Sequence, residues 1–398
     1  MKRLLCAMAL VLAGPGEFAG AAETPIESRA ALEAYLAAHP QSPFDALSPG
    51  ARERFLYALR FNERGLVGMD PNELADELDD AQIHAVLELF GPTVLTYAPP
   101  SRAEETQSLE RRVTKREGLG PAERRYTDWY KATRDVPADA PDRDARLAAL
   151  FDSQLGTLYA PSELRRIDDH ELRLLRVAAR SVALRTHDQR HVDAFHRVFE
   201  ERMRRNLVSS DDIATLRELL LAQRRFGEAR GIGNKYPTAK LPPLPNFSDE
   251  IGDASGVVTV WRLDPAGKRL TRSAVDVAPL QIFVTASCHF SKEAARDIGA
   301  DAVLGPLFEK RAQWLVAAPG DEPIEDVRGW NAELPRTPVA MIYDRAEWSF
   351  LPHWNMPTFF VVRDGKVVDS VSGWAGGDPR DRAALVAVLK RTGLLGAD

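Results

Sequence analysis

The stretch QIFVTASCHFS, residues 281–291, decides the fold of the C-terminal third of the chain. It belongs to an apolar, β-branched run, residues 280–285, of the kind that forms a buried strand. Ala286 and Ser287 break this run, and Cys288 then stands at the start of a predicted helix. The pattern therefore predicts a strand that delivers a thiol to a helix N-terminus, where unpaired N–H groups and the helix dipole favour thiolate.

A second stretch, MPTFFVVRDGK, residues 356–366, lies further on. Met356, Pro357 and Thr358 precede the apolar strand 358–362, and the turn 363–366 contains Asp-Gly, a common hairpin signal. This predicts two antiparallel strands, 358–362 and 367–372, behind a proline-containing loop.

The strands predicted in this third alternate with helices after an initial hairpin. Strands are predicted at 257–263, 270–275, 280–285, 313–318, 339–343, 358–362 and 367–372. Helices are predicted at 291–310, 324–334, 346–351 and 382–391. Such alternation indicates parallel pairing through right-handed crossovers, and hence an α/β domain.

Taken together, these motifs resemble the thioredoxin superfamily over about residues 256–395, in a layout similar to the TlpA-type proteins and the peroxiredoxins. The resemblance implies that Cys288 is the redox nucleophile, that the Met356–Pro357 bond is cis, and that this loop docks an extended substrate segment. The family's Cys-x-x-Cys motif is Cys-x-x-Ser here, because Ser291 stands in the second position. A mixed disulfide at Cys288 would then need an external thiol for its release.

The N-terminal part has mainly helical periodicity. We expect an irregular all-helical domain at 22–236, a Pro-rich linker at 237–255 and the thioredoxin-like α/β domain at 256–398. Helices are predicted at 30–38, 51–61, 73–77, 81–90, 124–132, 169–185, 190–205 and 213–224, with long loops over the rest of 99–146. Residues 219–229 faintly resemble a tetratricopeptide-type helical hairpin, but no constant repeat follows.

The first 21 residues have the pattern of a cleaved export signal. Lys2 and Arg3 precede an apolar stretch, residues 4–13, and small residues follow at 19–21. Removing residues 1–21 takes away Lys2, Arg3 and Glu17, so the net charge of −6 becomes −7. We expect a periplasmic or secreted protein that neither spans a membrane after cleavage nor binds nucleic acid.

Cleavage would also remove Cys6, leaving Cys288 as the only thiol. Such a cysteine is inert and buried, paired with another molecule, or kept reactive. His289 could tune the thiolate or be incidental, and Ser291 could simply bond first-turn N–H groups.

The leading hypothesis is single-cysteine thiol–disulfide exchange by Cys288, Ser291 and His289. Its partners would be envelope proteins or a low-molecular-weight thiol, with Met356, Pro357 and Thr358 contacting the substrate.

One alternative is a non-catalytic adaptor or binding module, and a weaker one is a one-cysteine peroxidase. Thr285 matches a peroxidase Thr-x-x-Cys motif, but Gln281 stands where that motif has Pro. No cofactor is expected. His187, His191 and His196 are close enough in sequence to suggest a metal site, yet neighbouring arginines favour a solvated helix face, so no metal is expected.

Overall fold

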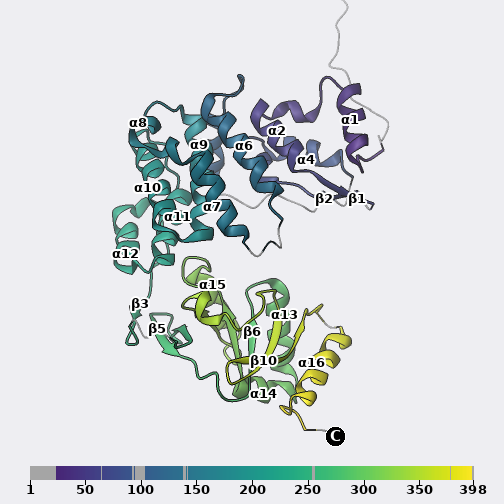
Figure 1. Ribbon diagram of the computed structural model, residues 1–398, viewed down its shortest axis with the longest axis vertical. Helices are drawn as coiled ribbons and strands as arrows, with labels where there is room; N and C mark the ends of the chain where they lie inside the picture. The colour runs from purple at the N-terminus through teal and green to yellow at the C-terminus, as the bar shows by residue number, and fades with distance from the viewer. Residues whose placement is uncertain are drawn as a thin grey trace, which may run out of the picture. The chain divides into compact units, whose positions relative to one another are not determined.

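The computed structural model describes residues 24–63, 65–91, 94, 104–137, 140, 142–252, 256–376 and 378–396 (Figure 1). The predicted export signal, residues 1–21, lies outside these residues. By its internal contacts the chain divides into two units, one made of Met1–Ser101 with Thr114–Leu119 and the other of Arg102–Val113 with Gly120–Asp398. Within the described residues, no helix is both long and apolar enough to cross a membrane.

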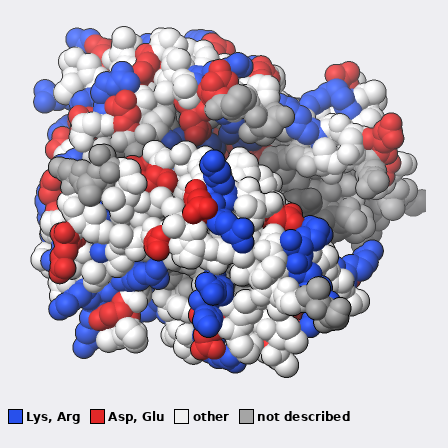
Figure 2. All heavy atoms as spheres, turned by 60° about the horizontal axis from the view of Figure 1, so that its bottom comes forward, with Lys and Arg blue, Asp and Glu red and all other residues white. Residues whose placement is uncertain are grey.

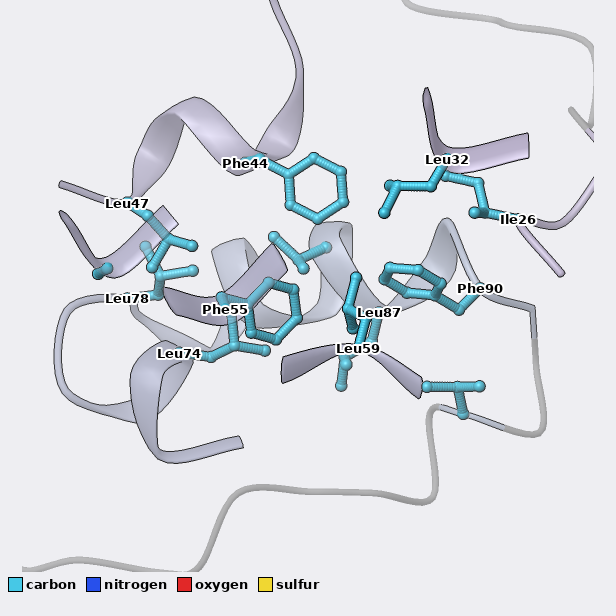
Figure 3. Close-up of a cluster of buried hydrophobic side chains, with 13 residues drawn as sticks. Ile26, Leu32, Phe44, Leu47, Phe55, Leu59, Leu74, Leu78, Leu87 and Phe90 are labelled. Atoms are coloured by element: carbon cyan, nitrogen blue, oxygen red, sulfur yellow. The ribbon is translucent and has the colours of Figure 1, made fainter. Parts of the chain in front are cut away.

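The first unit packs short helices and a hairpin around a hydrophobic core (Figure 3). Its elements are α1 (Arg29–Ala38), η1 (Pro43–Ala46), α2 (Pro49–Ala58), β1 (Arg60–Asn62), β2 (Gly65–Gly68), α3 (Pro71–Ala75) and α4 (Asp80–Glu88). The ring of Phe44 lies 6.1 Å from that of Phe55 and 6.2 Å from that of Phe90. The helix predicted at 51–61 is α2, which is capped by Ser48 and ends at Ala58 because residues 60–62 pair as a strand.

The second unit begins with helices. These are α5 (Glu104–Val113), α6 (Pro121–Asp135), α7 (Arg143–Gln154), η3 (Gly156–Tyr159), α8 (Pro161–Leu164), α9 (Asp169–Thr186), α10 (Gln189–Arg204), α11 (Ser210–Ala222), α12 (Phe226–Lys235) and η4 (Pro237–Ala239). The helices predicted at 169–185 and 190–205 are confirmed, and the Asp168 side chain accepts from the Glu171 N–H as expected of an N-cap. Helix α11 starts before the predicted residue 213, because Ser209 caps it.

The helix predicted at 124–132 is present within α6, but the prediction of long loops over the rest of 99–146 was wrong, because α5 and the start of α7 lie there. Helix α5 shows why its pattern was missed: a charged residue, Glu110, is fully buried. Its carboxylate lies 3.2 Å from Arg176 of α9 and 3.4 Å from Arg202 of α10. Where a helix buries a charged residue that is paired with other charges, the buried face is not marked by apolar residues. The apolar periodicity that identifies a helix in the sequence is then missing.

The C-terminal part is one mixed sheet in the order β10-β9-β6-β7-β8-β4-β5-β3. The strands are β3 (Asn246–Ser248), β4 (Thr259–Leu263), β5 (Arg269–Ala274), β6 (Gln281–Thr285), β7 (Ala312–Val316), β8 (Val339–Ile342), β9 (Thr358–Arg363) and β10 (Lys366–Ser372). Strands β6, β7 and β8 are parallel, while β9 runs antiparallel to both β6 and β10. All the predicted strands are present.

The helices around this sheet are α13 (His289–Ala300), α14 (Leu304–Arg311), α15 (Ile324–Glu333), η5 (Arg345–Trp348) and α16 (Pro379–Arg391). The single helix predicted at 291–310 is in fact two. Asp301 accepts hydrogen bonds from the N–H groups of Val303 and Leu304, both at 2.8 Å, and so starts α14 after α13 has ended.

The segment predicted as a linker contributes strand β3, which pairs in parallel with β5. The ring of Phe247 in β3 stacks on that of Phe226 in α12 at 3.8 Å, and Phe226 meets the buried Trp261 of β4 edge-on at 5.5 Å. Short pairing and aromatic contacts therefore join the helices of this unit to its sheet.

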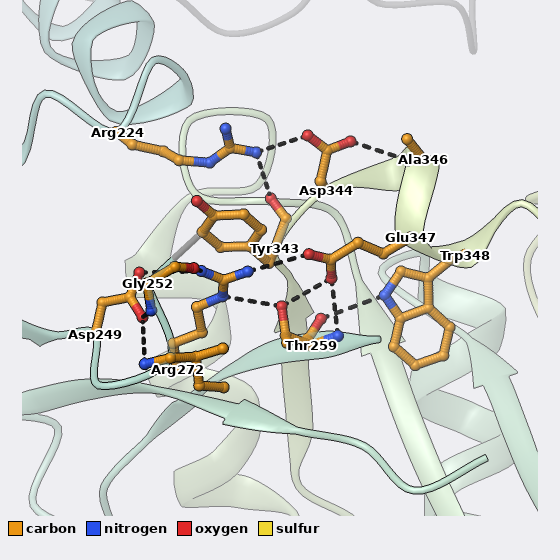
Figure 4. A network of polar contacts seen from close by, with 11 residues as sticks. Arg224, Asp249, Gly252, Thr259, Arg272, Tyr343, Asp344, Ala346, Glu347 and Trp348 are labelled. Atoms are coloured by element: carbon orange, nitrogen blue, oxygen red, sulfur yellow. Dashed lines mark hydrogen bonds and ion pairs between the residues drawn. The ribbon is translucent and has the colours of Figure 1, made fainter. Parts of the chain in front are cut away.

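A polar network strengthens the same junction (Figure 4). Arg224, just after α11, donates to Asp344 at 2.8 Å and lies 4.0 Å from the Tyr343 ring centroid. Arg272 of β5 lies 3.3 Å from the same centroid. The second unit thus has a helical part joined to an α/β part, in which β7-β6-β9-β10 with α13 and α16 form a thioredoxin-like arrangement.

Candidate functional site

Cys288 lies where strand β6 gives way to helix α13. It is the N-cap residue of that helix, and its backbone carbonyl accepts from the N–H groups of Ser291 and Lys292 at 3.1 and 3.2 Å. The cysteine is half-buried and is the free cysteine of the described chain. The predicted placement of a thiol at a helix start is therefore present, although its Sγ accepts no capping hydrogen bond from the helix.

Two polar groups lie next to the sulfur. The Sγ atom is 3.2 Å from the Oγ of Ser291, and it donates to the carbonyl of Met356 at 3.6 Å. Ser291 is fully buried, so its hydroxyl lies beneath the sulfur and away from solvent. A hydroxyl in this position can donate to the sulfur once a thiolate forms, whereas a carbonyl cannot.

His289 points away from the sulfur's neighbours. Its side chain is 72% exposed, and its Nε2 lies 2.7 Å from Glu293, one turn further along α13. Phe290 is also exposed, at 52%. The structure therefore brings Ser291 to Cys288 but directs His289 to a surface ion pair.

The proline loop lies against this helix start. The Met356–Pro357 bond is cis, as expected. Met356 is 46% exposed, whereas Pro357 and Thr358 are buried. Thr358 donates to the Asn355 carbonyl at 2.8 Å and lies opposite Thr285 in the β6–β9 pairing. Of the three predicted substrate-contacting residues, only Met356 offers its side chain to solvent.

Thr285 holds the proline loop in place from the β6 side. Its hydroxyl donates to the Asn355 carbonyl at 2.6 Å and accepts from the Thr358 N–H at 3.2 Å. The hydroxyl thus bonds the loop and not the sulfur. A Thr at the end of a buried strand, opposite another Thr, is the sequence signal for this role.

Glu322 is a residue of the site that the sequence analysis missed. It follows β7, and both its carboxylate oxygens accept from the Ser287 hydroxyl, at 2.8 and 3.0 Å. Burial raises the pKa of Glu322. The negative charges of Asp326 and Asp321 raise it further, whereas the Ser287 hydrogen bond and the charge of Lys292 lower it. The signal was available, because the carboxyl ends of neighbouring parallel strands, here β6 and β7, meet at one sheet edge.

A polar cavity of about 210 Å³ adjoins Ser287 and Glu322. Lys292 of α13 and Asp326 of α15 also line it, with Trp330 forming an apolar wall. The cavity therefore brings together the start of α13, the loop after β7 and the first turn of α15.

The three histidines considered as metal ligands turn in different directions. His191 is buried, with its ring 2.8 Å from the Thr186 hydroxyl and 3.1 Å from Asp152, so it does not lie on a solvated face. His187 bonds Asp321 and His196 lies near Glu200. Among the residues that the structure describes, no group of three or more His, Cys, Asp or Glu side chains is placed to hold a metal.

Charges are mixed on the face of the molecule shown in Figure 2, where acidic and basic side chains are interspersed among uncharged residues. A groove that tracks a nucleic-acid backbone needs basic side chains gathered along one path. That face shows no such path among its described residues.

No protein-family model matches the chain, and no curated protein matches it. Among solved structures, it is similar to a thioredoxin-like protein from Bacteroides caccae, with 13% identity, covering 67% of this chain and 94% of that one. The TM-score is 0.21, which is too low to carry any argument. The fold class rests on the strand order: a helical region precedes a thioredoxin-like α/β region, with a half-buried cysteine where β6 meets α13.

Proposed function

We propose that the protein is an exported, single-cysteine thiol–disulfide exchange protein that acts through Cys288. The observation that carries the proposal is the setting of the sulfur. It is half-buried at the start of α13, 3.2 Å from the Ser291 hydroxyl and 3.6 Å from the Met356 carbonyl. Thiols that exchange disulfides combine partial exposure with groups that stabilise the thiolate.

The exposed apolar side chains support a protein partner. Phe290 and Met356 are large hydrophobic residues that are about half exposed, and both lie beside Cys288 in the chain or in space. Apolar side chains around a reactive group can bury part of a partner's surface. The neighbouring Met356 backbone would align an extended partner segment.

The proposed exchange has two steps. The Cys288 thiolate attacks one sulfur of a partner disulfide, forming the mixed disulfide, while the other partner sulfur leaves as a thiolate and takes up a proton. Ser291 supplies a hydroxyl where a resolving thiol would act, so the mixed disulfide is released by an external thiolate. That thiol comes from a low-molecular-weight thiol or a second protein.

Export is a separate part of the proposal and rests on residues 1–21 alone. N-terminal sequencing of the protein from an envelope fraction tests it, with a mature start near residue 22 as the expected result. Detection of the uncleaved N-terminus in a cytosolic fraction would contradict export.

The alkylation rate of Cys288 against pH tests the reactive thiol. A titration midpoint below the ordinary thiol pKa of about 8.5 supports the proposal, and an ordinary or raised midpoint contradicts it. Non-reducing capture then tests for partners: discrete mixed disulfides should form with the wild-type protein and be absent with Cys288→Ser.

A matched pair of variants tests the docking surface. Phe290 and Val303 are both 52% exposed, but only Phe290 lies beside Cys288. Phe290→Ser should reduce capture while Val303→Ser leaves it unchanged. Equal effects of the two substitutions would show that the apolar rim does not select partners.

A non-catalytic adaptor is the second candidate. It is favoured by the lack of a backbone N–H bond to Sγ and by Ser291 in place of a second thiol. If Cys288→Ala keeps the cellular function of the full chain, the adaptor is supported and the redox proposal fails.

A further inference from the structure

The turn that follows β7, residues 318–323, contacts the ends of helices α9 and α11 on one side and Ser287, just before α13, on the other. Gly320 lies against α11 with φ of +101°, a conformation that favours glycine. A Cβ atom there would lie 2.5 Å from both the Glu218 carbonyl oxygen and the Ala222 nitrogen. The turn is therefore seated directly on the backbone of α11.

The next residue ties the turn to α9. Asp321 Oδ1 lies 2.8 Å from Nε2 of His187, the left-handed residue that ends α9. The hydrogen bond to Asp321 raises the pKa of His187, partly opposed by burial. Two further charged groups lie near His187: Arg224 disfavours the protonated ring, and Asp344 favours it.

Glu322, the next residue of the turn, bonds the residue that precedes the cysteine. Glu322 accepts both hydrogen bonds from Ser287, the immediate neighbour of Cys288. The charged groups around Glu322 are Lys292 of α13, Asp326 of α15 and Asp321 of its own turn.

The turn is too short for these contacts to move independently. The N–H groups of Asp321 and Glu322 both donate to the Ala318 carbonyl at 3.0 Å, and Pro319 and Glu322 form an isolated bridge. A displacement of Asp321 from α9 therefore displaces Glu322 from Ser287.

We propose that the turn 318–323 is a positioning element through which the ends of helices α9 and α11 fix Ser287, and with it the Cys288 thiol. Asp321 and Glu322 are positioning residues in this inference, since neither touches the sulfur. The inference rests on the proposed function, because it concerns the reactivity of the same thiol.

The experiment measures the second-order alkylation rate of Cys288 by iodoacetamide in the full chain between pH 5 and 9, with labelling of Cys288 read by peptide mass spectrometry. Ser287→Ala and Glu322→Ala should each lower the rate at pH 7 about fivefold, the factor that corresponds to a net hydrogen bond of about 1 kcal/mol. Glu322→Gln keeps an oxygen that accepts from Ser287, so it should stay within about twofold of wild type.

The link to the helices is tested by His187→Ala and Asp321→Ala, which break one ion pair from opposite sides. If one variant fails to fold, the other still tests the link. Each should lower the rate, and Asp321→Ala should add nothing in the Ser287→Ala background. The matched control is Asp249→Asn, which weakens an ion pair with Arg272 elsewhere in the α/β part and should leave the rate unchanged.

The outcomes separate this inference from the proposed function. Rates that respond as stated without any captured partner support the inference and contradict the exchange function. Wild-type-like rates in Glu322→Ala and Asp321→Ala overturn the inference, even if partners are captured. Additive effects of Asp321→Ala and Ser287→Ala also overturn it, and a Cys288 that no reagent labels in any variant overturns both.

Discussion

Arg272 of strand β5 should be among the most sensitive charged residues of the second unit (Figure 4). Its side chain is 3% exposed. The guanidinium donates to Thr259 Oγ1 at 3.0 Å, to Asp249 at 3.1 Å, to the Gly252 carbonyl at 2.7 Å and to Glu347 at 3.1 Å. These contacts tie the segment before β4 and the 3-10 helix η5 to the sheet.

Replacing Arg272 with Met keeps most of the volume and removes the charge. Breaking a buried ion pair from one side costs about 3–5 kcal/mol, because the remaining charge is left without a partner. Here Glu347 keeps the Thr259 N–H and hydroxyl at 2.8 and 2.7 Å, and Asp249 is 31% exposed and can be hydrated. We therefore expect the lower end, a loss of about 3 kcal/mol in the free energy of unfolding.

Urea unfolding followed by circular dichroism measures this loss. Arg269→Met on the same strand is the matched control, since Arg269 is exposed and its replacement should change the free energy by less than about 0.5 kcal/mol. A loss of under about 1 kcal/mol for Arg272→Met, or equal losses for the two variants, would refute the assignment of this network as a stabilising junction.

Three further predictions use the same unfolding assay. Phe283→Ala in β6 should lower the free energy of unfolding by about 3–5 kcal/mol, because its ring is fully buried, and a loss below about 1 kcal/mol would contradict that packing. Asp168→Ala should cost about 1 kcal/mol by removing the α9 cap, and Asp168→Asn should restore most of it; equal losses would contradict the cap. The hydrogen bond to Asp321 raises the pKa of His187, so the stabilisation from this pair is complete below about pH 6.5 and is lost as the pH rises through the raised pKa. The difference in the free energy of unfolding between wild type and Asp321→Ala should therefore shrink with rising pH. A difference that stays constant with pH would refute this prediction.

The α/β part was the more predictable half because its central strands are short, continuous apolar runs bounded by turn signals. Residues 282–285 are buried, as expected of a central strand covered on both faces, and the apolar run 282–284 marks β6. The hairpin at 363–366 and the cis bond before Pro357 were also predicted correctly. The contact between Cys288 and Ser291 follows from helical spacing alone.

The remaining features depend on contacts that a local pattern does not encode. Strand β3 is three residues long and directly follows a proline, and Phe247 within it stacks on Phe226 of α12. Glu322 acts on Ser287 across 35 residues of sequence, through the adjacency of two parallel strand ends. His289 contacts Glu293, one helical turn further along α13. The sequence alone does not say whether His289 lies near Glu293 or near Cys288.

The pairing of β3 with β5 has a practical consequence for any study of the thioredoxin-like region by itself. A fragment that begins at residue 256 would lack the strand at the sheet edge and would lose Phe226, which covers Trp261. It would present an open strand edge and an uncovered tryptophan to solvent, both of which promote self-association. Redox measurements on this protein should therefore use a chain that retains α11, α12 and β3, so that aggregation is not mistaken for covalent partner capture.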